Sequence, residues 1–214
     1  MNKVGTFISI ILTFAAVSTA ARSEISEWRD GQNVNSPYMR SYGHALPPIG
    51  HVGFCRRNPT ECTTLADDSE RVDLTAKRER DLREVNDLVN QLVKPESDLQ
   101  LYGRLEHWTY PSEKGDCEDY VLLKRKLLLE RSWPASALLI TVVRDEHNEG
   151  HAILTARTNN GDYILDNKRK GVLVWNDSGY TFIKRQSFND PISWVSLMPP
   201  GLPQEATLSG TRAR

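Results

Sequence analysis

The stretch Gly115-Asp116-Cys117-Glu118-Asp119-Tyr120 places a cysteine where a predicted loop becomes a helix. The helix is predicted from about Asp116 to Arg131, because inward-facing apolar residues recur with helical spacing and the pattern stops before Trp133-Pro134. The first turn of a helix presents unpaired N–H groups and the positive end of the helix dipole, and both lower the pKa of a thiol. Cys117 is therefore a candidate nucleophile.

The acidic neighbours of Cys117 argue in the other direction. Asp116, Glu118 and Asp119 would oppose a thiolate unless they point away from the sulfur or bind a cation. Asp116 could instead cap the helix, with Glu118 and Asp119 favouring its positive end. A lone cysteine is also more often a small buried hydrophobe than a nucleophile.

The chain before this stretch divides into two parts. Residues 22 to 68 are rich in Gly, Pro, Ser and Asn and predict an extended or looping segment that wraps the domain. From about Arg71 to Val93, apolar residues recur mostly at three- and four-residue steps, which predicts an amphipathic helix that ends before Pro95.

The chain after the cysteine-bearing helix changes from helical to strand-like spacing. Short segments rich in β-branched and aromatic residues alternate with Gly, Asn and Asp turns, so we expect an antiparallel sheet. The predicted strands are Ala137 to Val143, His151 to Arg157, Tyr163 to Asp166, Val172 to Trp175, Tyr180 to Arg185 and Ile192 to Leu197. Helices followed by a meandering sheet predict an α+β fold in which the sheet packs one face on the helices.

One predicted hairpin offers a base for the thiol. His151 begins a strand, the next strand ends in Asp166, and a turn within residues 158–161 joins them. A two- or four-residue loop sets Asp166 opposite residue 153, one diagonal step from His151 on the same face; a three- or five-residue loop would put them on opposite faces. The first register gives His151 an acidic partner and predicts a Cys117-His151-Asp166 triad.

Each member of this triad also has an ordinary structural interpretation. His151 could be a hydrogen-bonded strand residue, and Asp166 could cap the Asp166-Asn167-Lys168 turn. Spacing alone leaves these alternatives open, because the members of a triad lie far apart in the chain.

The other two cysteines, Cys55 and Cys62, are predicted to form a disulfide. They lie in one irregular segment in which Asn58-Pro59 favours a turn. A metal half-site is a weaker interpretation, because no second pair of ligands has suitable spacing. Cys117 is then the unpaired thiol.

The N-terminus predicts export. Met1 to Lys3 is positively charged, Val4 to Val17 is apolar, and Ser18-Thr19-Ala20 supplies small residues for cleavage, so residues 1–20 are predicted to be a secretory signal peptide. An uncleaved anchor is the alternative, but the run is shorter than the roughly 20 apolar residues that span a bilayer. The mature protein is then expected to be periplasmic or secreted.

The charge and length of the chain limit its class. The chain has 27 Lys and Arg residues against 28 Asp and Glu residues, a balance that argues against a nucleic-acid partner. After the signal, we expect an N-terminal segment at residues 21–68, one domain at residues 69–202 and a loose tail at residues 203–214.

Three blocks of this sequence resemble the bacterial transglutaminase-like cysteine proteinase family. They are Gly115-Asp116-Cys117-Glu118-Asp119-Tyr120, Glu149-Gly150-His151-Ala152-Ile153-Leu154 and Tyr163-Ile164-Leu165-Asp166-Asn167, and the likeness runs from about Gly53 to at least Trp194. The resemblance implies a papain-like core with a Cys117-His151-Asp166 triad. It also implies calcium bound by the acidic residues beside the nucleophile, Asp116, Glu118 and Asp119.

The resemblance implies a biological setting as well. The LapG-type members of this family are periplasmic proteases that clip large surface adhesins and release bacteria from biofilm. A calcium-dependent endopeptidase acting on a protein substrate is therefore expected, with a surface adhesin as candidate substrate and an inner-membrane receptor as candidate regulator. A transglutaminase-type amine transferase and a catalytically silent, calcium-stabilised binding protein are the competing functions.

Overall fold

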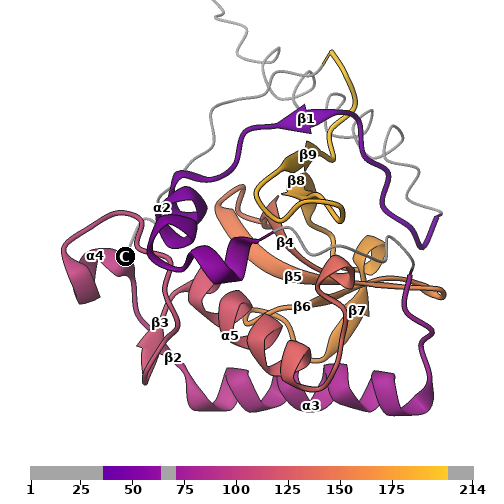
Figure 1. The fold of residues 1–214 in the computed structure, drawn as a ribbon, viewed down its shortest axis with the longest axis horizontal. Helices are drawn as coiled ribbons and strands as arrows, with labels where there is room; N and C mark the ends of the chain where they lie inside the picture. Colours follow the sequence, from indigo (N-terminus) through magenta and orange to yellow (C-terminus); the bar gives the residue numbers. More distant parts are fainter. Residues whose placement is uncertain (1–35, 64–70, 202–214) are drawn as a thin grey trace, which may run out of the picture.

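A seven-stranded sheet lies at the centre of the computed structural model, which describes residues 36–63 and 71–201 (Figure 1). The strand order is β1-β9-β8-β4-β5-β6-β7, and every neighbouring pair is antiparallel. The strands are β1 (His44–Ala45), β4 (Leu138–Arg144), β5 (Gly150–Thr158), β6 (Gly161–Leu165), β7 (Val172–Val174), β8 (Thr181–Gln186) and β9 (Trp194–Ser196). The predicted antiparallel sheet is confirmed. The predicted signal peptide and C-terminal tail lie outside the described residues.

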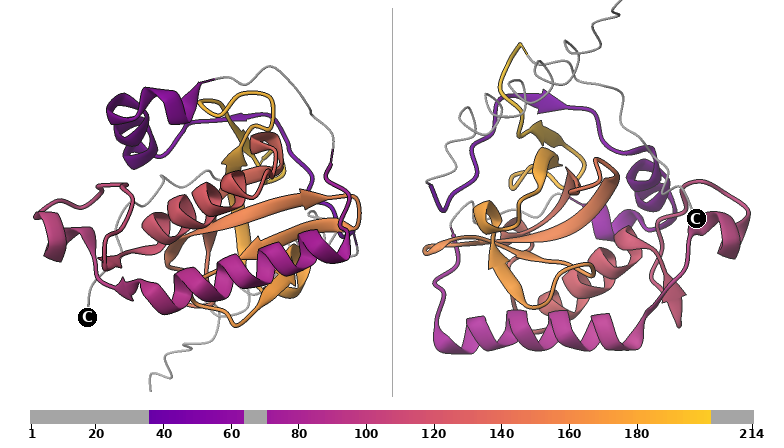
Figure 2. Two further views of the ribbon diagram at one scale, coloured as in Figure 1. Left: turned by 60° about the horizontal axis from the view of Figure 1, so that its bottom comes forward. Right: turned by 180° about the vertical axis from the view of Figure 1, so that it is seen from behind.

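Two helices cover one face of this sheet, α3 (Ala76–Leu92) and α5 (Cys117–Glu130) (Figure 2). Helix α5 packs against β5, and α3 packs against α5 and β7. Because side chains alternate across a strand, one set of strand residues joins the helices in the main core. The buried strand residues of this core are Leu138, Ile140, Ala152, Leu154, Ala156, Leu165 and Trp194.

Helix α3 begins later than the predicted Arg71. The hydroxyl of Thr75 accepts a hydrogen bond from the Arg78 amide and caps the helix. The residues before Thr75 pair with the sheet instead of forming a helical turn. The Val72 amide donates to the Arg157 carbonyl, and the Val72 carbonyl accepts from the Asn159 amide. Backbone pairing with β5 and the turn after it therefore replaces the first predicted helical turn.

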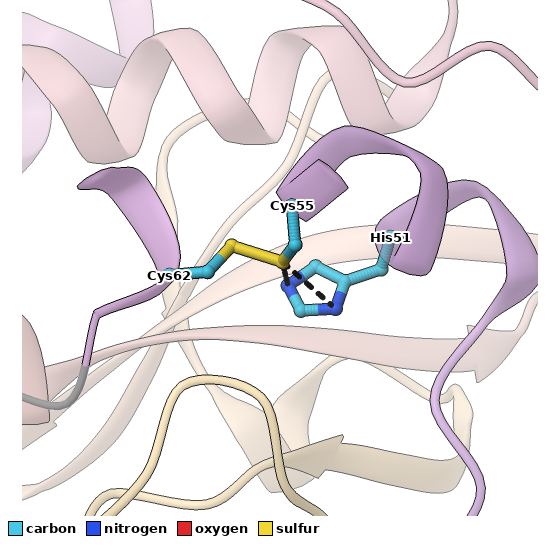
Figure 3. A group of neighbouring side chains, drawn as sticks. All are labelled: His51, Cys55 and Cys62. Carbon is cyan, nitrogen blue, oxygen red and sulfur yellow. Dashed lines mark hydrogen bonds between the residues drawn. A yellow bond between two sulfur atoms is a disulfide. The ribbon is translucent and has the colours of Figure 1, made fainter. Parts of the chain in front are cut away.

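The prediction of an extended or looping chain before residue 68 is wrong for helix α2 (Ile49–Arg57), which is followed by the 3-10 segment η1 (Pro59–Cys62). Helix α2 has no side-chain cap, so local signals for it are weak. Tertiary contacts hold it instead: Phe54 is buried in the core, and a Cys55–Cys62 disulfide joins α2 to η1 (Figure 3). The predicted disulfide and the free thiol of Cys117 are both confirmed.

His51 packs against this disulfide (Figure 3). Its ring also lies edge-on to two tryptophans, Trp108 and Trp194. Burial lowers the pKa of His51 to about 4, and the charge of Arg125 adds to the effect. Both neighbouring sulfurs are joined in a disulfide and cannot act as thiolate ligands. This group of residues is therefore part of the core.

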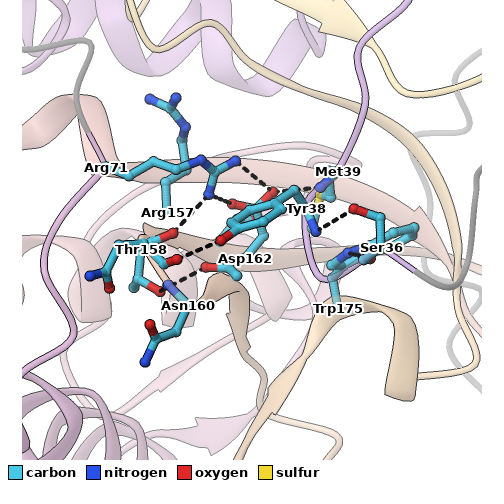
Figure 4. Close-up of polar contacts among 12 residues, drawn as sticks. Ser36, Tyr38, Met39, Arg71, Arg157, Thr158, Asn160, Asp162 and Trp175 are labelled. Carbon is cyan, nitrogen blue, oxygen red and sulfur yellow. Dashed lines mark hydrogen bonds and ion pairs between the residues drawn. The ribbon is translucent and has the colours of Figure 1, made fainter.

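The chain around residues 36–39 crosses the other face of the sheet and is held there by the buried carboxylate of Asp162 (Figure 4). The Met39 amide donates to Asp162 Oδ2 at 2.7 Å, and Arg71 Nη1 donates to Asp162 Oδ1 at 2.7 Å. The Tyr38 hydroxyl donates to the Asn159 carbonyl at 2.5 Å. The N-terminal segment thus wraps the sheet and is fastened beside the β5–β6 turn.

A short excursion between the two long helices brings a further acidic residue towards Cys117. The two-residue strands β2 (Lys94–Pro95) and β3 (Lys114–Gly115) pair in parallel, and helix α4 (Asp98–Tyr102) follows β2. The Glu96 amide also donates to the Gly115 carbonyl at 3.0 Å. The start of α4 is thereby held against the start of α5.

Within residues 36–63 and 71–201, no helix has the length and apolar content needed to cross a membrane.

Candidate active site

The β5–β6 hairpin brings His151 and Asp166 together. Its register pairs Leu154 with Leu165 and Thr158 with Gly161, so Asn159 and Asn160 form the two-residue loop. Continuing this register by one residue sets Asp166 opposite Ile153, as the sequence predicts. His151 Nε2 lies 2.7 Å from Asp166 Oδ1, and both side chains are buried.

Asp166 receives two further hydrogen bonds. The Lys168 amide donates to Oδ1 at 2.9 Å, and the Tyr180 hydroxyl donates to Oδ2 at 2.7 Å. Burial alone would raise the pKa of Asp166. The hydrogen bond and charge of His151 act against burial, as do the hydrogen bonds from the Lys168 amide and Tyr180, and together they lower the pKa to about 2. Asp166 is therefore a carboxylate at neutral pH. Sequence reasoning placed Tyr180 in a strand and missed this contact.

The second nitrogen of His151 remains available for chemistry. Nδ1 is buried and has no hydrogen-bond partner within the described part of the chain. The ring is held by the Nε2 bond to Asp166 and by an edge-on contact with Tyr180, whose ring centroid is 5.8 Å away. A buried imidazole nitrogen without a partner is costly, so this atom has the features of a site that takes up a proton during a reaction.

Cys117 is the first residue of α5 and is partly buried. Its sulfur donates to Glu118 Oε2 at 3.1 Å, and no hydrogen bond joins it to His151 among residues 36–63 and 71–201. Cys117 packs with the helix-side core that includes Ala152, whereas the ring of His151, the residue before Ala152, lies beside Tyr180. The structure thus brings the cysteine to the start of β5 but turns its sulfur towards Glu118.

The surroundings of Cys117 disfavour a thiolate. Burial raises its pKa well above the ordinary value, and the charges of Glu118 and Asp116 raise it further. The nearby backbone amide of Ala152 opposes these effects but does not overcome them. The lowering of the pKa expected from the helix terminus is therefore outweighed by burial of the thiol and by the charge of Glu118, which points towards the sulfur.

Three carboxylates gather beside Cys117: Asp98, Asp116 and Glu118 each offer an oxygen within 4.8 Å of the others. Asp116 occupies the N-cap position of α5 but makes no side-chain capping bond, so the simple capping interpretation does not describe it. Its Oδ2 instead accepts from the Asp98 amide at 3.3 Å. Sequence reasoning missed Asp98, which reaches the group only through the β2–β3 pairing.

The negative charge of this acidic group is not balanced by any partner described above. Burial raises the pKa of all three carboxyls, and for Asp116 burial together with the charge of nearby Asp98 raises it to about 6. Asp98 Oδ1 and Asp116 Oδ1 are buried and have no hydrogen-bond partner in the described structure. Oxygen-only donors, close like charges and unpartnered oxygens fit a hard cation such as calcium.

Asp119, the third acidic residue predicted to bind metal, lies outside this group. Its Oδ1 accepts a hydrogen bond from the Thr109 amide at 2.8 Å, and burial raises its pKa to about 8. A side chain at Gly115 would come within 2.7 Å of Asp119 Oδ2, so a glycine is needed there. Asp119 thus holds the chain around Thr109 against the start of α5.

These features define an α+β protein of the transglutaminase-like class, with a cysteine at a helix start and a histidine and an aspartate on neighbouring strands. The model of the family described as bacterial transglutaminase-like cysteine proteinase, BTLCP, matches residues 41–201. The chain belongs to this family. The implied fold and the membership in a cysteine protease family are thereby confirmed.

Solved structures similar to the chain include three of Legionella pneumophila LapG. One has 25% sequence identity and a TM-score of 0.44, covering 50% of this chain and 64% of LapG. The EGTA-treated form has the same identity and TM-score, with 62% of LapG covered. The calcium-bound form has 23% identity and a TM-score of 0.47, covering 61% of this chain and 74% of LapG. In the first two, the chain spans less than two thirds of the relative. None of the curated proteins compared with the chain matches it.

Proposed function

We propose that this protein is an exported cysteine endopeptidase in which Cys117 is the nucleophile, His151 the base and Asp166 the residue that orients the histidine. Membership in a cysteine proteinase family supports the reaction class. The observation that carries the assignment is the state of His151: Nε2 is bound to the Asp166 carboxylate, while Nδ1 is buried without a partner. The free thiol of Cys117 lies at the start of the helix packed on the same strand.

The proposed reaction is acyl transfer to sulfur and then to water. His151 Nδ1 takes the thiol proton, and the Cys117 sulfur attacks the carbonyl carbon of a peptide bond. Backbone N–H groups around Cys117 hold the oxyanion, and the leaving amine takes the proton from His151 as the carbon–nitrogen bond breaks. His151 then takes a proton from water, which attacks the thioester. As the carbon–sulfur bond breaks, His151 gives that proton to the Cys117 sulfur, and the carboxylic acid product leaves.

Before this reaction can begin, the Cys117 side chain must give up its hydrogen bond to Glu118 and turn towards His151. Asp98, Asp116 and Glu118 are the residues that would hold calcium. A bound calcium ion would supply positive charge that neutralises these carboxylates and lowers the pKa of the neighbouring thiol. The existence of calcium-bound and EGTA-treated structures of Legionella pneumophila LapG is consistent with this assignment.

Export and the nature of the substrate complete the proposal. A Cys55–Cys62 disulfide fits an oxidising compartment such as the periplasm, in agreement with the predicted signal at residues 1–20. The substrate is a protein, for which a large surface adhesin is the family-based candidate. An inner-membrane receptor is the candidate regulator on the same basis.

Cleavage is tested by incubating residues 21–214 with periplasmic and surface proteins and identifying new N-termini by mass spectrometry. New termini that require calcium, and that are missing with Cys117→Ala or a chelator, are the expected result. Glutamine peptides with a labelled amine distinguish the amine-transferase alternative, because hydrolysis gives no label incorporation. If neither cleavage nor incorporation occurs and a thiol-reactive probe fails to label Cys117 at neutral pH, the silent binding-protein alternative holds.

A further inference from the structure

We infer that Tyr180, supported by Arg169, is a positioning residue that fixes the Asp166 carboxylate and, through it, the ring of His151. This inference rests on the proposed function, since it assigns a role within the same triad. The Tyr180 hydroxyl donates to Asp166 Oδ2 at 2.7 Å, while His151 and the Lys168 amide both bind Oδ1. Tyr180 is thus the hydrogen-bond donor to the second oxygen in the described structure.

Two donors on one oxygen would leave the carboxylate free to tilt or rotate about its own axis. A third donor on the other oxygen removes that freedom, because both ends of the carboxylate plane are then held. The hairpin supplies His151 and the bend directly after β6 supplies the Lys168 amide, whereas Tyr180 comes from the chain just before β8. The orientation of Asp166 therefore depends on a part of the sheet that the β5–β6 hairpin does not include.

Arg169 fixes the direction of the tyrosine hydroxyl. Arg169 Nε donates to the Tyr180 oxygen at 3.2 Å, and its guanidinium carbon lies 5.1 Å from the centre of the Tyr180 ring. With that N–H group directed at the oxygen, the hydroxyl proton is left to point at Asp166 Oδ2. Arg169 also binds Glu146 at 3.1 Å and the Ser178 carbonyl at 3.4 Å, so the guanidinium is held in place.

The turn before Tyr180 sets the position of its ring. The 3-10 segment η3 (Trp175–Asp177) leads into Ser178, whose hydroxyl donates to the Trp175 carbonyl and accepts from the Tyr180 amide. Gly179 has a φ of 74°, a left-handed conformation that glycine adopts without steric cost. The tyrosine ring is thereby placed edge-on to His151, with the ring planes at 78°.

The hydroxyl stays protonated in the working range of pH. Burial raises the pKa of Tyr180, and its hydrogen bond to the Asp166 carboxylate raises it further. Tyr180 can therefore act as a permanent donor to Asp166 and takes no part in proton transfer. It contacts the orienting residue and the edge of the base, which distinguishes a positioning residue from a catalytic one.

The test compares Tyr180→Phe with Tyr38→Phe, using the natural or a peptide substrate found by N-terminus identification. Tyr38 also donates a hydroxyl hydrogen bond, but to the Asn159 carbonyl at the opposite end of the hairpin. Tyr180→Phe should lower kcat about tenfold with KM unchanged, which corresponds to losing one hydrogen bond to a charged group. Tyr38→Phe should leave kcat unchanged.

A double-mutant cycle separates positioning from a general structural effect. In an Asp166→Ala background, Tyr180→Phe should have no further effect on single-turnover cleavage, because the group through which it acts is gone. An equal tenfold loss in both backgrounds, or an unchanged kcat in the single variant, would overturn the inference. Failure of the proposed function gives a different result, since cleavage would then survive Cys117→Ala.

Discussion

The two halves of the candidate site differ in how completely their polar groups are paired. On the sheet side, each oxygen of Asp166 accepts at least one hydrogen bond, and its pKa is lowered to about 2. On the helix side, Asp98 Oδ1 and Asp116 Oδ1 are buried without partners, and burial raises the pKa of both carboxyls. The carboxylate of the sheet half is thus paired within the protein, although His151 Nδ1 has no partner in the described structure, whereas the carboxyls of the helix half need protons or a cation to balance their charge.

This difference indicates how activity is divided within the site. His151, the proposed base, and Asp166, its proposed orienting residue, are held in position by the fold itself. The thiol of Cys117, the proposed nucleophile, is kept protonated, because its sulfur is hydrogen-bonded to Glu118 and its pKa is raised by burial and by neighbouring carboxylates. Conditions that neutralise the acidic group should therefore act on Cys117 and leave the His151–Asp166 pair unchanged.

Removing a proposed catalytic side chain from either half should give the largest effect on cleavage. Cys117→Ala and His151→Ala should each lower kcat/KM by on the order of 10³-fold or more, because members of a triad act as a unit. Thermal unfolding should show that both variants remain folded. Unimpaired cleavage by Cys117→Ser would show that the helix half does not carry the nucleophile.

Calcium should stabilise the helix half through its carboxylates. At a calcium concentration about 100 times Kd, the free energy of unfolding should rise by about 2.7 kcal/mol, because the ion binds only the native state. Calorimetry and thermal unfolding should show this gain in the unmodified protein and not in an Asp116→Asn, Glu118→Gln double variant.

A matched control for the calcium experiment is Glu146→Gln. Glu146 belongs to the other acidic group of the described structure, formed by Asp145, Glu146 and His147, and it is paired with Arg169. This variant should keep the full stabilisation by calcium. If the double variant still gains stability from calcium, the ion binds elsewhere and the two halves of the site do not differ in the way described.

Removing the disulfide, which lies outside both halves of the site, should affect only the free energy of unfolding. Replacing both cysteines, as Cys55→Ser with Cys62→Ser, should lower the free energy of unfolding by about 2 to 3 kcal/mol, since a short loop is no longer closed in the unfolded chain. The folded variant should keep its calcium response. A loss of that response would show that α2 and η1 help to form the acidic group.

The sequence predicts the sheet half better than the helix half, for a physical reason. His151 and Asp166 lie on one hairpin, where a two-residue turn and the alternation of side chains determine which residues meet. Tyr180 reaches Asp166 from the chain that leads into another strand, and Asp98 reaches Asp116 through pairing of two-residue strands too short to leave a pattern. Local spacing carries no signal for contacts of that kind.

The same reasoning explains the error in the N-terminal segment. Helix α2 has no capping side chain and is held by burial of Phe54 and by the disulfide, so its composition predicts a loop. The direction of the Glu118 side chain could not be predicted from the sequence either. After burial, the charge of Glu118 is the next largest cause of the raised pKa of Cys117, and only the folded arrangement shows that this side chain points at the sulfur.

The most direct test of this account is the pH dependence of Cys117 alkylation by iodoacetamide, measured with calcium and with a chelator. Because Glu118 and Asp116 raise the pKa of the thiol, neutralising them with calcium should lower its apparent pKa and speed alkylation at neutral pH. The Asp116→Asn, Glu118→Gln variant should show the lowered pKa in both conditions. An apparent pKa of Cys117 that is the same with calcium, with the chelator and in the variant would contradict the account.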